Sequence, residues 1–408
     1  MIIPSIDLMG GKAVQLKEGK DHVLTSDKDP LELAQEFNRY GPVAVIDLDA
    51  ALGKGDNLDV IRAICNVAQV RAGGGIRDVE RAGKLLRAGA ERLIIGTSAT
   101  PELLSQLPKE RLMVALDHRD GQVVDHGWTQ STGESLQDRA QRLAPYCGSY
   151  LCTFVADEGH MNGMNLDEVQ TIQKQLPHPV TVAGGIAQTA EVIQLSKMGV
   201  DVQVGMALYT GHLSLADAVV GALDFEKCPH LPTIVQDEAG QVLMLAYSTP
   251  ESLTLALKEG RGIYYSRSRK EIWKKGETSG HTQTLLSCRP DCDRDTLLFT
   301  VRQTGPACHT GGYSCFGSGQ KFSLEYLFEI IKQRKLEMPE KSFTTKLLKD
   351  RDFLHSKIME EAEEVCTAQK PEDWVWEIAD VLYFMSVLAV DEGLDWRQIE
   401  AELGGRHR

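Results

Sequence analysis

The chain has 408 residues, which at the usual ~150 residues per domain is enough for two or three domains. Hydrophobic residues make up 42% and charged residues 25%, so a mainly disordered chain is excluded. The net charge of -14 opposes nucleic-acid binding, no apolar run approaches the ~18 residues of a membrane span, and 9 cysteines are too few for a disulfide scaffold. We expect a cytoplasmic protein without nucleic-acid or membrane partners.

Short β-branched runs alternate eight times with longer amphipathic segments in the first part of the chain. This alternation predicts parallel βαβ units and, at eight units in ~220 residues, a closed (β/α)8 TIM barrel over residues 1–228. An open doubly wound sheet is the alternative. The predicted strands are 2–7, 43–48, 69–72, 92–95, 112–116, 150–154, 180–182 and 202–204.

The predicted barrel carries an internal repeat of about 110 residues. The pairs at this offset are Asp7 with Asp117, Gly74 with Gly184 and, one residue shorter, Gly96 with Gly205. Such a repeat predicts two similar halves, each with an aspartate and a glycine-rich loop after equivalent strands. Because the carboxyl ends of barrel strands carry the active site, these residues are candidates for it.

The residue types fit a substrate with a phosphate at each end. Glycines at 73–75 and at 184–185 let backbone N–H groups approach a phosphate closely. The two aspartates can then serve as general acid and general base without a cofactor. In the alternative reading, the aspartates are strand-end caps and the glycines tight turns, although the shared offset favours a site.

The barrel segment resembles the histidine-biosynthesis isomerase that converts phosphoribosylformimino-aminoimidazole carboxamide ribotide from aldose to ketose. The motifs that carry this resemblance are PSIDLMGGKAVQL, VIDLDAALGKGDN, AGGGIR, ALDHRDG, the GW at 127–128, VAGGI and VGMALY. The resemblance implies an Amadori rearrangement with Asp7 and Asp117 as the acid/base pair and Thr153 as a further catalytic residue. It implies substrate or phosphate contacts from Gly73, Gly74, Gly75, Arg77, Gly96, Thr97, Trp128, Gly184, Gly185 and Gly205.

The sequence departs from this family in two places. The family pattern T-D-I-x-R-D-G is TFVADEG here, so Glu158 stands where aspartate is usual, and Met206 replaces the arginine of G-R-A-L. Because methionine cannot donate to a phosphate, we expect weaker substrate binding. The alternative is a degenerate barrel that serves only as an assembly scaffold for two hydrolases. The related cyclase barrel is disfavoured, since Ser5 and Ile6 stand where its start pattern carries a cysteine.

A smaller, strand-rich α+β domain is predicted over residues 229–320. Pro229 and Pro232 mark the linker, and period-2 alternation begins at Thr233. Three aspartates at alternate positions of an expected extended segment offer hard oxygen ligands for Mg²⁺, and three cysteines offer thiolates for Zn²⁺ with one position open for water. The ligands are Asp291, Asp293 and Asp295 for Mg²⁺, and Cys292, Cys308 and Cys315 for Zn²⁺. The alternatives are a solvated acidic turn for the aspartates, and buried or disulfide-bonded cysteines, although a cytoplasmic location disfavours a disulfide.

These motifs, together with the basic stretch at 264–281, closely resemble phosphoribosyl-AMP cyclohydrolase over about residues 233–317. The resemblance implies hydrolytic opening of the purine ring with water activated by zinc. It implies roles for His281 in catalysis and for Arg267 and Arg269 in substrate binding. In that family the zinc thiolates come from two subunits, so a homodimer through this domain is implied.

An all-α domain is predicted over residues 321–408, where long segments show helical apolar spacing. Glu361 with Glu364, and Glu377 with Asp380, are three residues apart, so each pair shares a helix face and the four predict a Mg²⁺ site for a pyrophosphate. A solvated acidic surface is the alternative. The pattern, including SFTTKL at 342–347, resembles phosphoribosyl-ATP pyrophosphohydrolase and implies catalysis by Glu361. We therefore expect a trifunctional enzyme acting on phosphorylated ribotides.

Overall fold

The computed structural model describes residues 1–17, 21–119, 121–125, 127–128, 130–161, 163–317 and 319–406. Asp120 of the ALDHRDG motif lies outside these residues. The chain forms two compact units, Met1–Gly319 and Gln320–His407. The first unit contains both the barrel and the second sheet, so the division into three domains at the sequence-derived boundaries stays a prediction.

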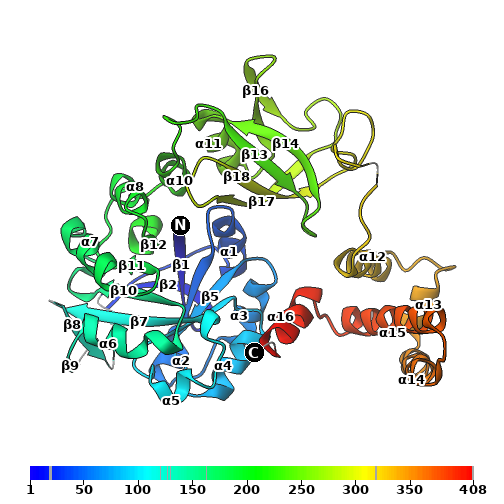
Figure 1. The fold of residues 1–408 in the computed structure, drawn as a ribbon, viewed down its shortest axis with the longest axis horizontal. Helices are drawn as coiled ribbons and strands as arrows, with labels where there is room; N and C mark the ends of the chain where they lie inside the picture. The colour runs from blue at the N-terminus through cyan, green and yellow to red at the C-terminus, as the bar shows by residue number, and fades with distance from the viewer. Residues whose placement is uncertain are drawn as a thin grey trace. The chain divides into compact units, whose positions relative to one another are not determined.

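Eight parallel strands close into a barrel at the N-terminal end of the chain (Figure 1). They are β1 (Ile2–Met9), β4 (Val43–Asp47), β5 (Val70–Gly73), β6 (Arg92–Ile95), β7 (Leu112–Arg119), β10 (Ser149–Phe154), β11 (Val180–Ala183) and β12 (Asp201–Val204). The closing pair is β7 with β10, and β12 returns to β1. The barrel prediction is therefore confirmed, and the open doubly wound alternative is wrong.

Helices connect the strands, and several begin at a capping side chain. Asp29, Asp78 and Ser135 each accept a backbone N–H of the helix that they precede, which satisfies one of its unpaired donors. Inside the barrel, the apolar side chains of Ile94 and Met113 pack with those of β10 and β11, so the interior is a filled core. The helices are α1 (Pro30–Asn38), α2 (Leu48–Leu52), α3 (Leu58–Cys65), α4 (Val79–Arg87), α5 (Pro101–Leu104), α6 (Leu136–Leu143), α7 (Leu166–Gln175), α8 (Thr189–Lys197), α9 (Met206–Tyr209) and α10 (Leu215–Ala222).

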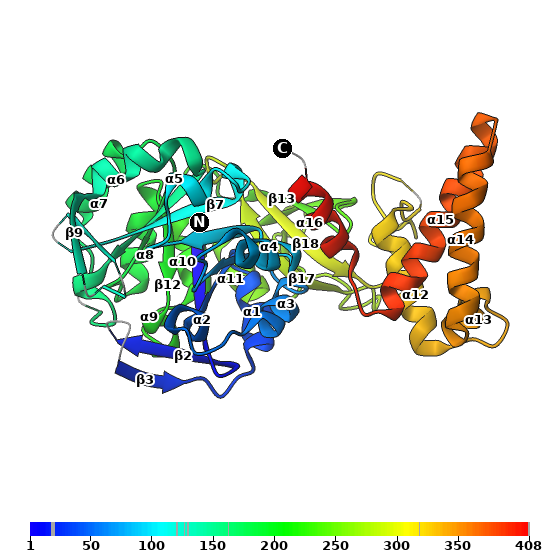
Figure 2. The same ribbon diagram turned by 90° about the horizontal axis from the view of Figure 1, so that it is seen from below.

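Two antiparallel extensions continue from the carboxyl ends of barrel strands. The first, β2 (Lys12–Lys17) and β3 (Asp21–Thr25), pairs with β1 and projects from the ring of strands in Figure 2. The second, β8 (Gln122–Asp125) and β9 (Gln130–Ser135), continues from β7. Both extensions therefore start at the face where a barrel enzyme carries its chemistry.

A four-stranded sheet and a hairpin follow the barrel, which confirms a strand-rich region. The elements are β13 (Leu231–Gln236), β14 (Val242–Ser248), α11 (Pro250–Glu259), β15 (Ile263–Ser266), β16 (Glu271–Lys274), β17 (Gln283–Pro290) and β18 (Leu297–Gln303). Pro232, expected in the linker, lies in β13, a central strand. The sheet tolerates it because the pairing of β13 with β18 begins only at Thr233.

Strand β17 is joined to the amino-terminal face of the barrel through Arg289. Its half-buried guanidinium donates to the backbone oxygen of Asn38 at 3.0 Å, to the side-chain oxygen of Asn38 at 3.2 Å and to Oε1 of Gln69 at 3.0 Å. Asn38 in turn donates to the backbone oxygen of Leu286 at 3.1 Å, and the N–H of Cys288 donates to Arg39. The junction is therefore built on hydrogen bonds to neutral oxygens that precede β4 and β5.

Replacing Arg289 by methionine should destabilise this junction. The methionine keeps much of the apolar stem but leaves the oxygens of Asn38 and Gln69 without their donor, so the free energy of unfolding should fall by about 2 kcal/mol. Denaturant titration of the full chain measures it. Arg302→Gln is the control, because Arg302 is an exposed arginine of β18 paired with Glu238 and should change stability little. Equal stability of both variants would remove the assigned role.

The second unit is entirely helical among its described residues, which confirms the all-α prediction for this part. Its helices are α12 (Leu324–Glu337), α13 (Phe343–Lys349), α14 (Arg351–Thr367), α15 (Pro371–Asp391) and α16 (Trp396–Arg406). A separate core forms around Phe328, Ile331, Leu354 and Val387. None of the helices in the described part of the chain combines the length and apolar character of a membrane span.

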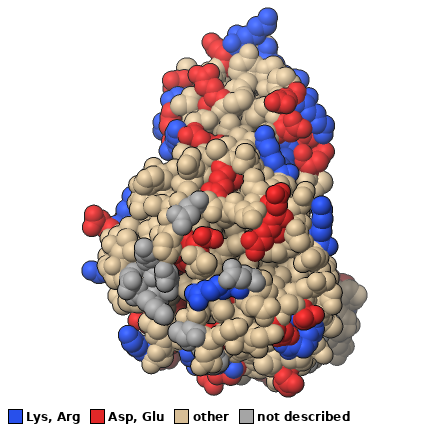
Figure 3. All heavy atoms as spheres, turned by 90° about the vertical axis from the view of Figure 1, so that its left-hand side faces the viewer, with Lys and Arg blue, Asp and Glu red and all other residues tan. Residues whose placement is uncertain are grey.

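Acidic and basic side chains are interspersed on the described surface that Figure 3 shows. They do not gather there into a continuous basic stripe of described residues. This face therefore offers no large cationic patch of described residues, in keeping with the net charge of -14.

Candidate active sites

Asp7 and Asp117 lie on opposite sides of the barrel near the carboxyl ends of their strands. Strand β1 is four strands away from β7 in either direction around the ring of eight. Both carboxylates are partly buried, and burial raises the pKa of Asp7 to about 6 and raises the pKa of Asp117. Two carboxyl groups with raised pKa values on facing walls are suited to acid–base chemistry.

A third strand-end aspartate, Asp47, shows what a structural carboxylate looks like here. Asp47 is fully buried, pairs with Arg81 at 2.7 Å and accepts the backbone N–H groups of Ala50 and Asn57. Asp7, by contrast, has a 3.3 Å hydrogen bond from Ser5 and forms no ion pair with a described residue. The alternative interpretation, in which a strand-end aspartate is a structural cap, therefore fits Asp47 and does not fit Asp7.

Asp117 is oriented by two neighbours. Trp128, whose backbone has a positive φ of 67°, donates its indole N–H to Oδ2 of Asp117 at 2.9 Å. Thr153 is the register partner of Asp117 across β7 and β10, and hydrogen bonds from Thr153 and Trp128 counter the rise that burial causes in the pKa of Asp117. Trp128, predicted as a substrate contact, thus also positions a carboxylate, and the catalytic role of Thr153 stays a prediction.

Glu158 is a third carboxylate of this site, and the sequence analysis recorded it only as a departure from the family pattern. It follows β10, and desolvation, then the charges of Asp7 and Asp117, raise the pKa of Glu158 to about 7. The only signal for it in the sequence was its place five residues after Thr153. The barrel mouth therefore holds three carboxyl groups that interact electrostatically.

Glu158→Gln should stabilise the chain at alkaline pH. Because the pKa of Glu158 rises from 4.5 to about 7 on folding, the folded state binds the proton more tightly and stability falls as pH rises through that window. The neutral amide removes this loss, so the variant should exceed the wild type by about 1–2 kcal/mol at pH 8 and match it near pH 4. Denaturant titration at both pH values measures this, and a difference independent of pH would contradict it.

The glycine loops follow β5 and β11, as predicted. A Cβ on Gly74 would lie 2.2 Å from the backbone oxygen of Asp47, and one on Gly184 would lie 2.6 Å from that of Phe154. Gly75 and Gly185 also have positive φ. Close backbone packing therefore requires these glycines, while their phosphate contacts stay predictions.

The other predicted phosphate contacts differ in how available they are. Arg77 donates to the backbone oxygens of Ala50 and Ala51, so its guanidinium is engaged in hydrogen bonds within the protein. Met206 is buried at the start of α9. The remaining positions follow barrel strands or end one of them, and they are Gly73, Gly96, Thr97 and Gly205.

The three aspartates of DCDRD do come together, but a turn brings them together and not the alternation of an extended strand. The expectation of an extended segment is wrong, because Asp291 to Asp295 form the turn between β17 and β18, with Arg294 at φ 66°. The turn brings one oxygen each of Asp291, Asp293 and Asp295 within 4.8 Å of one another. Lys227 pairs with Asp293 at 3.2 Å and with Asp295 at 2.7 Å.

Two of the three predicted zinc ligands lie together. Cys308 and Cys315 are hydrogen-bonded neighbours, and hydrogen bonds from Thr310 lower the pKa of Cys308. Burial and then Cys308 raise the pKa of Cys315. A cation between two such sulfurs would relieve their repulsion, so the pair fits a soft metal. Among the described residues, Cys292 is not grouped with them.

The predicted substrate-binding arginines of this region have partners within the protein, whereas the predicted catalytic histidine has a ring nitrogen without one among the described residues. Arg267 lies over the ring of Tyr247 in β14, and Arg269 pairs with Glu271 of its own β15–β16 hairpin. His281 keeps a buried Nδ1 without a hydrogen-bond partner in the described structure. Lys275, which was not predicted, donates to the backbone oxygen of His281 and lies near Cys308 and Cys315.

The carboxylates of the helical unit meet across two helices. One oxygen each of Glu361 and Glu364 on α14 and Glu377 on α15 lie within 4.8 Å of one another. Burial and these neighbours raise the pKa of Glu377, and one of its oxygens is buried without a hydrogen-bond partner among described residues. Asp380 of α15 is not among these three, but burial and then the charge of Glu361 raise the pKa of Asp380. Such a cluster fits a hard divalent cation.

Lys357 is the counter-charge of this cluster. Its ammonium pairs with Glu360 at 2.8 Å and with Glu361 at 3.0 Å.

Three regions of the chain each carry a candidate site. The barrel has facing carboxyl groups, the strand-rich region has paired thiols, and the helical region has grouped carboxylates. Together they define a multidomain metabolic enzyme.

Family models match the chain in three consecutive segments. The description Histidine biosynthesis protein matches residues 1–214, Phosphoribosyl-AMP cyclohydrolase matches 244–317, and Phosphoribosyl-ATP pyrophosphohydrolase matches 324–407. The chain belongs to the histidine-biosynthesis family of enzymes and contains isomerase-type, cyclohydrolase and pyrophosphohydrolase segments.

Relatives cover the two halves separately. An imidazole-4-carboxamide isomerase of Methanosphaera stadtmanae is 37% identical over 54% of this chain and 98% of its own length. The histidine biosynthesis bifunctional protein HisIE of Halalkalibacterium halodurans is 40% identical over 46% of this chain and 97% of its own. The histidine biosynthesis trifunctional protein of Kluyveromyces lactis is 45% identical over 43% of this chain, which spans only 22% of that protein. These matches give no support to a scaffold-only barrel.

Proposed function

We propose that this chain catalyses three consecutive steps of histidine biosynthesis. The helical part hydrolyses phosphoribosyl-ATP to phosphoribosyl-AMP and pyrophosphate, the strand-rich part opens the purine ring, and the barrel isomerises the resulting aldose ribotide to the ketose. The observation that carries the proposal is the presence in one chain of three separate sites, each in the segment that matches the corresponding family. A cytoplasmic location stays a prediction of the composition.

The barrel step uses side chains alone. One of Asp7 and Asp117 donates a proton to the ribose ring oxygen, which opens the ring to an iminium at C1, and the other removes the proton from C2 to form the enolamine. Return of a proton to C1 and loss of the proton of the C2 hydroxyl then give the ketose. Thr153 and Trp128 hold Asp117 in place for this transfer. Glu158 adds a third carboxyl group to the site, and burial and then the charges of Asp7 and Asp117 raise the pKa of Glu158 to about 7.

We assign the two metals to the donor sets that fit them. Cys308 and Cys315, with Cys292 of the partner subunit, would hold zinc, and Asp291, Asp293 and Asp295 would hold magnesium. In such a site zinc supplies a bound water of lowered pKa. We assign proton transfer to the nearby side chain of His281. A homodimer through this region is part of the proposal, because the resemblance to the cyclohydrolase family implies that thiolates of two subunits share the zinc.

In the helical part, Glu361, Glu364, Glu377 and Asp380 would hold magnesium for the pyrophosphate group. Magnesium supplies charge neutralisation of the phosphates. Lys357 holds Glu361 in place through its ion pair.

The test of the barrel assignment is to give the full chain the purified aldose ribotide. We expect conversion to the ketose without added metal. A chain that opens the ring of phosphoribosyl-AMP but leaves the aldose unchanged would establish the scaffold alternative.

A further inference from the structure

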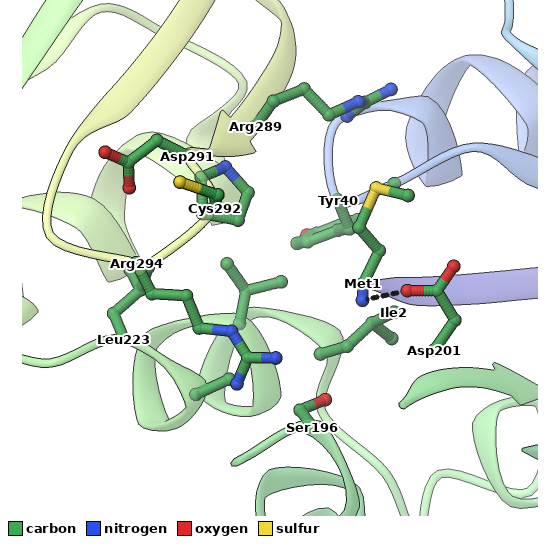
Figure 4. A pocket seen from close by; sticks show the side chains of 14 residues that line it. Met1, Ile2, Tyr40, Ser196, Asp201, Leu223, Arg289, Asp291, Cys292 and Arg294 are labelled. Atoms are coloured by element: carbon green, nitrogen blue, oxygen red, sulfur yellow. Dashed lines mark hydrogen bonds and ion pairs between the residues drawn. The ribbon is translucent and has the colours of Figure 1, made fainter. Parts of the chain in front are cut away.

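A cavity of about 350 Å³ lies between the amino-terminal face of the barrel and the turn that joins β17 to β18 (Figure 4). Its barrel wall includes Ile2 at the start of β1 and Asp201 at the start of β12, and its other wall includes Asp291 and Arg294. The volume is at the lower end of the range for small-molecule sites. Because Asp7 and Asp117 belong to the opposite ends of the barrel strands, this cavity is not the isomerase site.

The charged groups around the cavity leave a positive excess. Its lining carries Arg289 and Arg294 against the carboxylates of Asp201 and Asp291, and Asp201 is already paired with a further arginine, Arg71, at 3.1 Å. In a chain with a net charge of -14, a small cavity with this balance attracts anions.

Two polar groups of the cavity make no hydrogen bond with a described residue, although the charge of Asp201 acts on one of them, Arg294. The guanidinium of Arg294 makes no hydrogen bond or ion pair with a described residue, and Figure 4 shows it directed toward the side where Ser196 lies. Ser196 is only 2% exposed, and its hydroxyl has no hydrogen-bond partner among the described residues. An unpaired buried hydroxyl costs free energy unless a ligand or water satisfies it.

The rest of the lining is apolar. Ile2, Val219 and Leu223 form a wall that can cover a compact organic group. A ligand with one strongly anionic end and a small body therefore fits better than a free inorganic ion.

We propose that this cavity binds a phosphate monoester of a ribose-sized molecule, with Arg294 and Ser196 as the phosphate contacts. The choice of ribose rests on the proposed function, since ribotides are the substrates of this chain. The ligand is either the phosphate end of a substrate being opened in the strand-rich part or a separate effector. In both cases the barrel supplies Ser196, and the turn that carries the predicted metal ligands supplies Arg294.

Hydrogen exchange of the full chain with ribose 5-phosphate, and with ribose as the neutral control, locates the binding. We expect slower exchange at 218–224 and 291–296 with ribose 5-phosphate and no change with ribose. Binding in the isomerase site is separated from this signal, because it protects 73–77 and 184–187. Absence of protection at 218–224 and 291–296 at millimolar ligand would overturn the proposal.

Variants test the two contacts. Arg294→Gln should weaken the protection at 218–224 at least about 10-fold in ligand concentration, and Ser196→Ala several-fold, while leaving 73–77 as in the wild type. Arg302→Gln is the matched arginine control and should behave as wild type. Unchanged protection in both Arg294→Gln and Ser196→Ala would overturn the assignment.

The source of the ligand is decided by kinetics. If Ser196→Ala raises the KM for phosphoribosyl-AMP by the factor by which it weakens ribose 5-phosphate binding, the cavity is a substrate subsite. An unchanged KM with weakened binding identifies an effector site. Because exchange is measured without turnover, failure of this inference leaves the three proposed activities untouched.

Discussion

Asp7→Asn and Asp117→Asn should each lower isomerisation by about 100- to 10,000-fold while both hydrolytic steps proceed normally. Asparagine keeps the shape of the side chain but cannot exchange the proton, and a positioned acid or base contributes a factor of this size. The measurement is aldose-to-ketose conversion by the full chain, with ring opening and pyrophosphate release followed in parallel.

The loss should not come from unfolding. Because burial raises the pKa of Asp7 to about 6, a neutral side chain there removes a desolvated charge, and stability at pH 8 should be equal or higher. Asp59→Asn is the control, since Asp59 is an exposed carboxylate of α3 paired with Arg62, and it should leave all three steps unchanged. Near-normal isomerisation in both variants would remove the acid/base assignment.

Brief treatment with EDTA should stop pyrophosphate release and leave isomerisation intact. Carboxylates such as Glu361, Glu364 and Glu377 hold Mg²⁺ weakly enough to lose it to a chelator, and added Mg²⁺ should restore the activity at once. Ring opening should fail only after prolonged chelation, because thiolates hold Zn²⁺ far more tightly, and Mg²⁺ alone should not restore it.

Two variants connect these losses to residues. Cys308→Ser should remove bound zinc and ring opening only, and Glu361→Gln should abolish pyrophosphate release only. Cys366→Ser is the thiol control, because Cys366 is an exposed cysteine of α14 outside the predicted zinc set. Loss of isomerisation after brief chelation, or a purified chain without zinc, would contradict the assignments.

The barrel was predictable because its signals are local. Short β-branched runs fall on all eight observed parallel strands, and the shared offset of Asp7 and Asp117 locates two walls of one site without any long-range information. The two carboxylate pairs of the helical part were predictable for the same reason, since spacing on a helix fixes which side chains share a face.

Other features depend on turns and on contacts between distant segments. The alternation of Asp291, Asp293 and Asp295 suggested an extended strand, whereas the left-handed backbone of Arg294 makes a turn. The donation from Trp128 to Asp117 and the use of Arg77 by α2 are set by loop geometry that the spacing does not reveal. The Arg289 junction joins residues about 220 positions apart, and its partners are neutral, so no charge pattern marks it.

The most direct test of the whole account is to supply the full chain with phosphoribosyl-ATP and Mg²⁺ and to follow every product with time. We predict release of pyrophosphate, transient phosphoribosyl-AMP and aldose ribotide, and accumulation of the ketose as the final product. Accumulation of the aldose with no ketose would show a non-catalytic barrel, and unconsumed phosphoribosyl-ATP would contradict the assignment of the helical part.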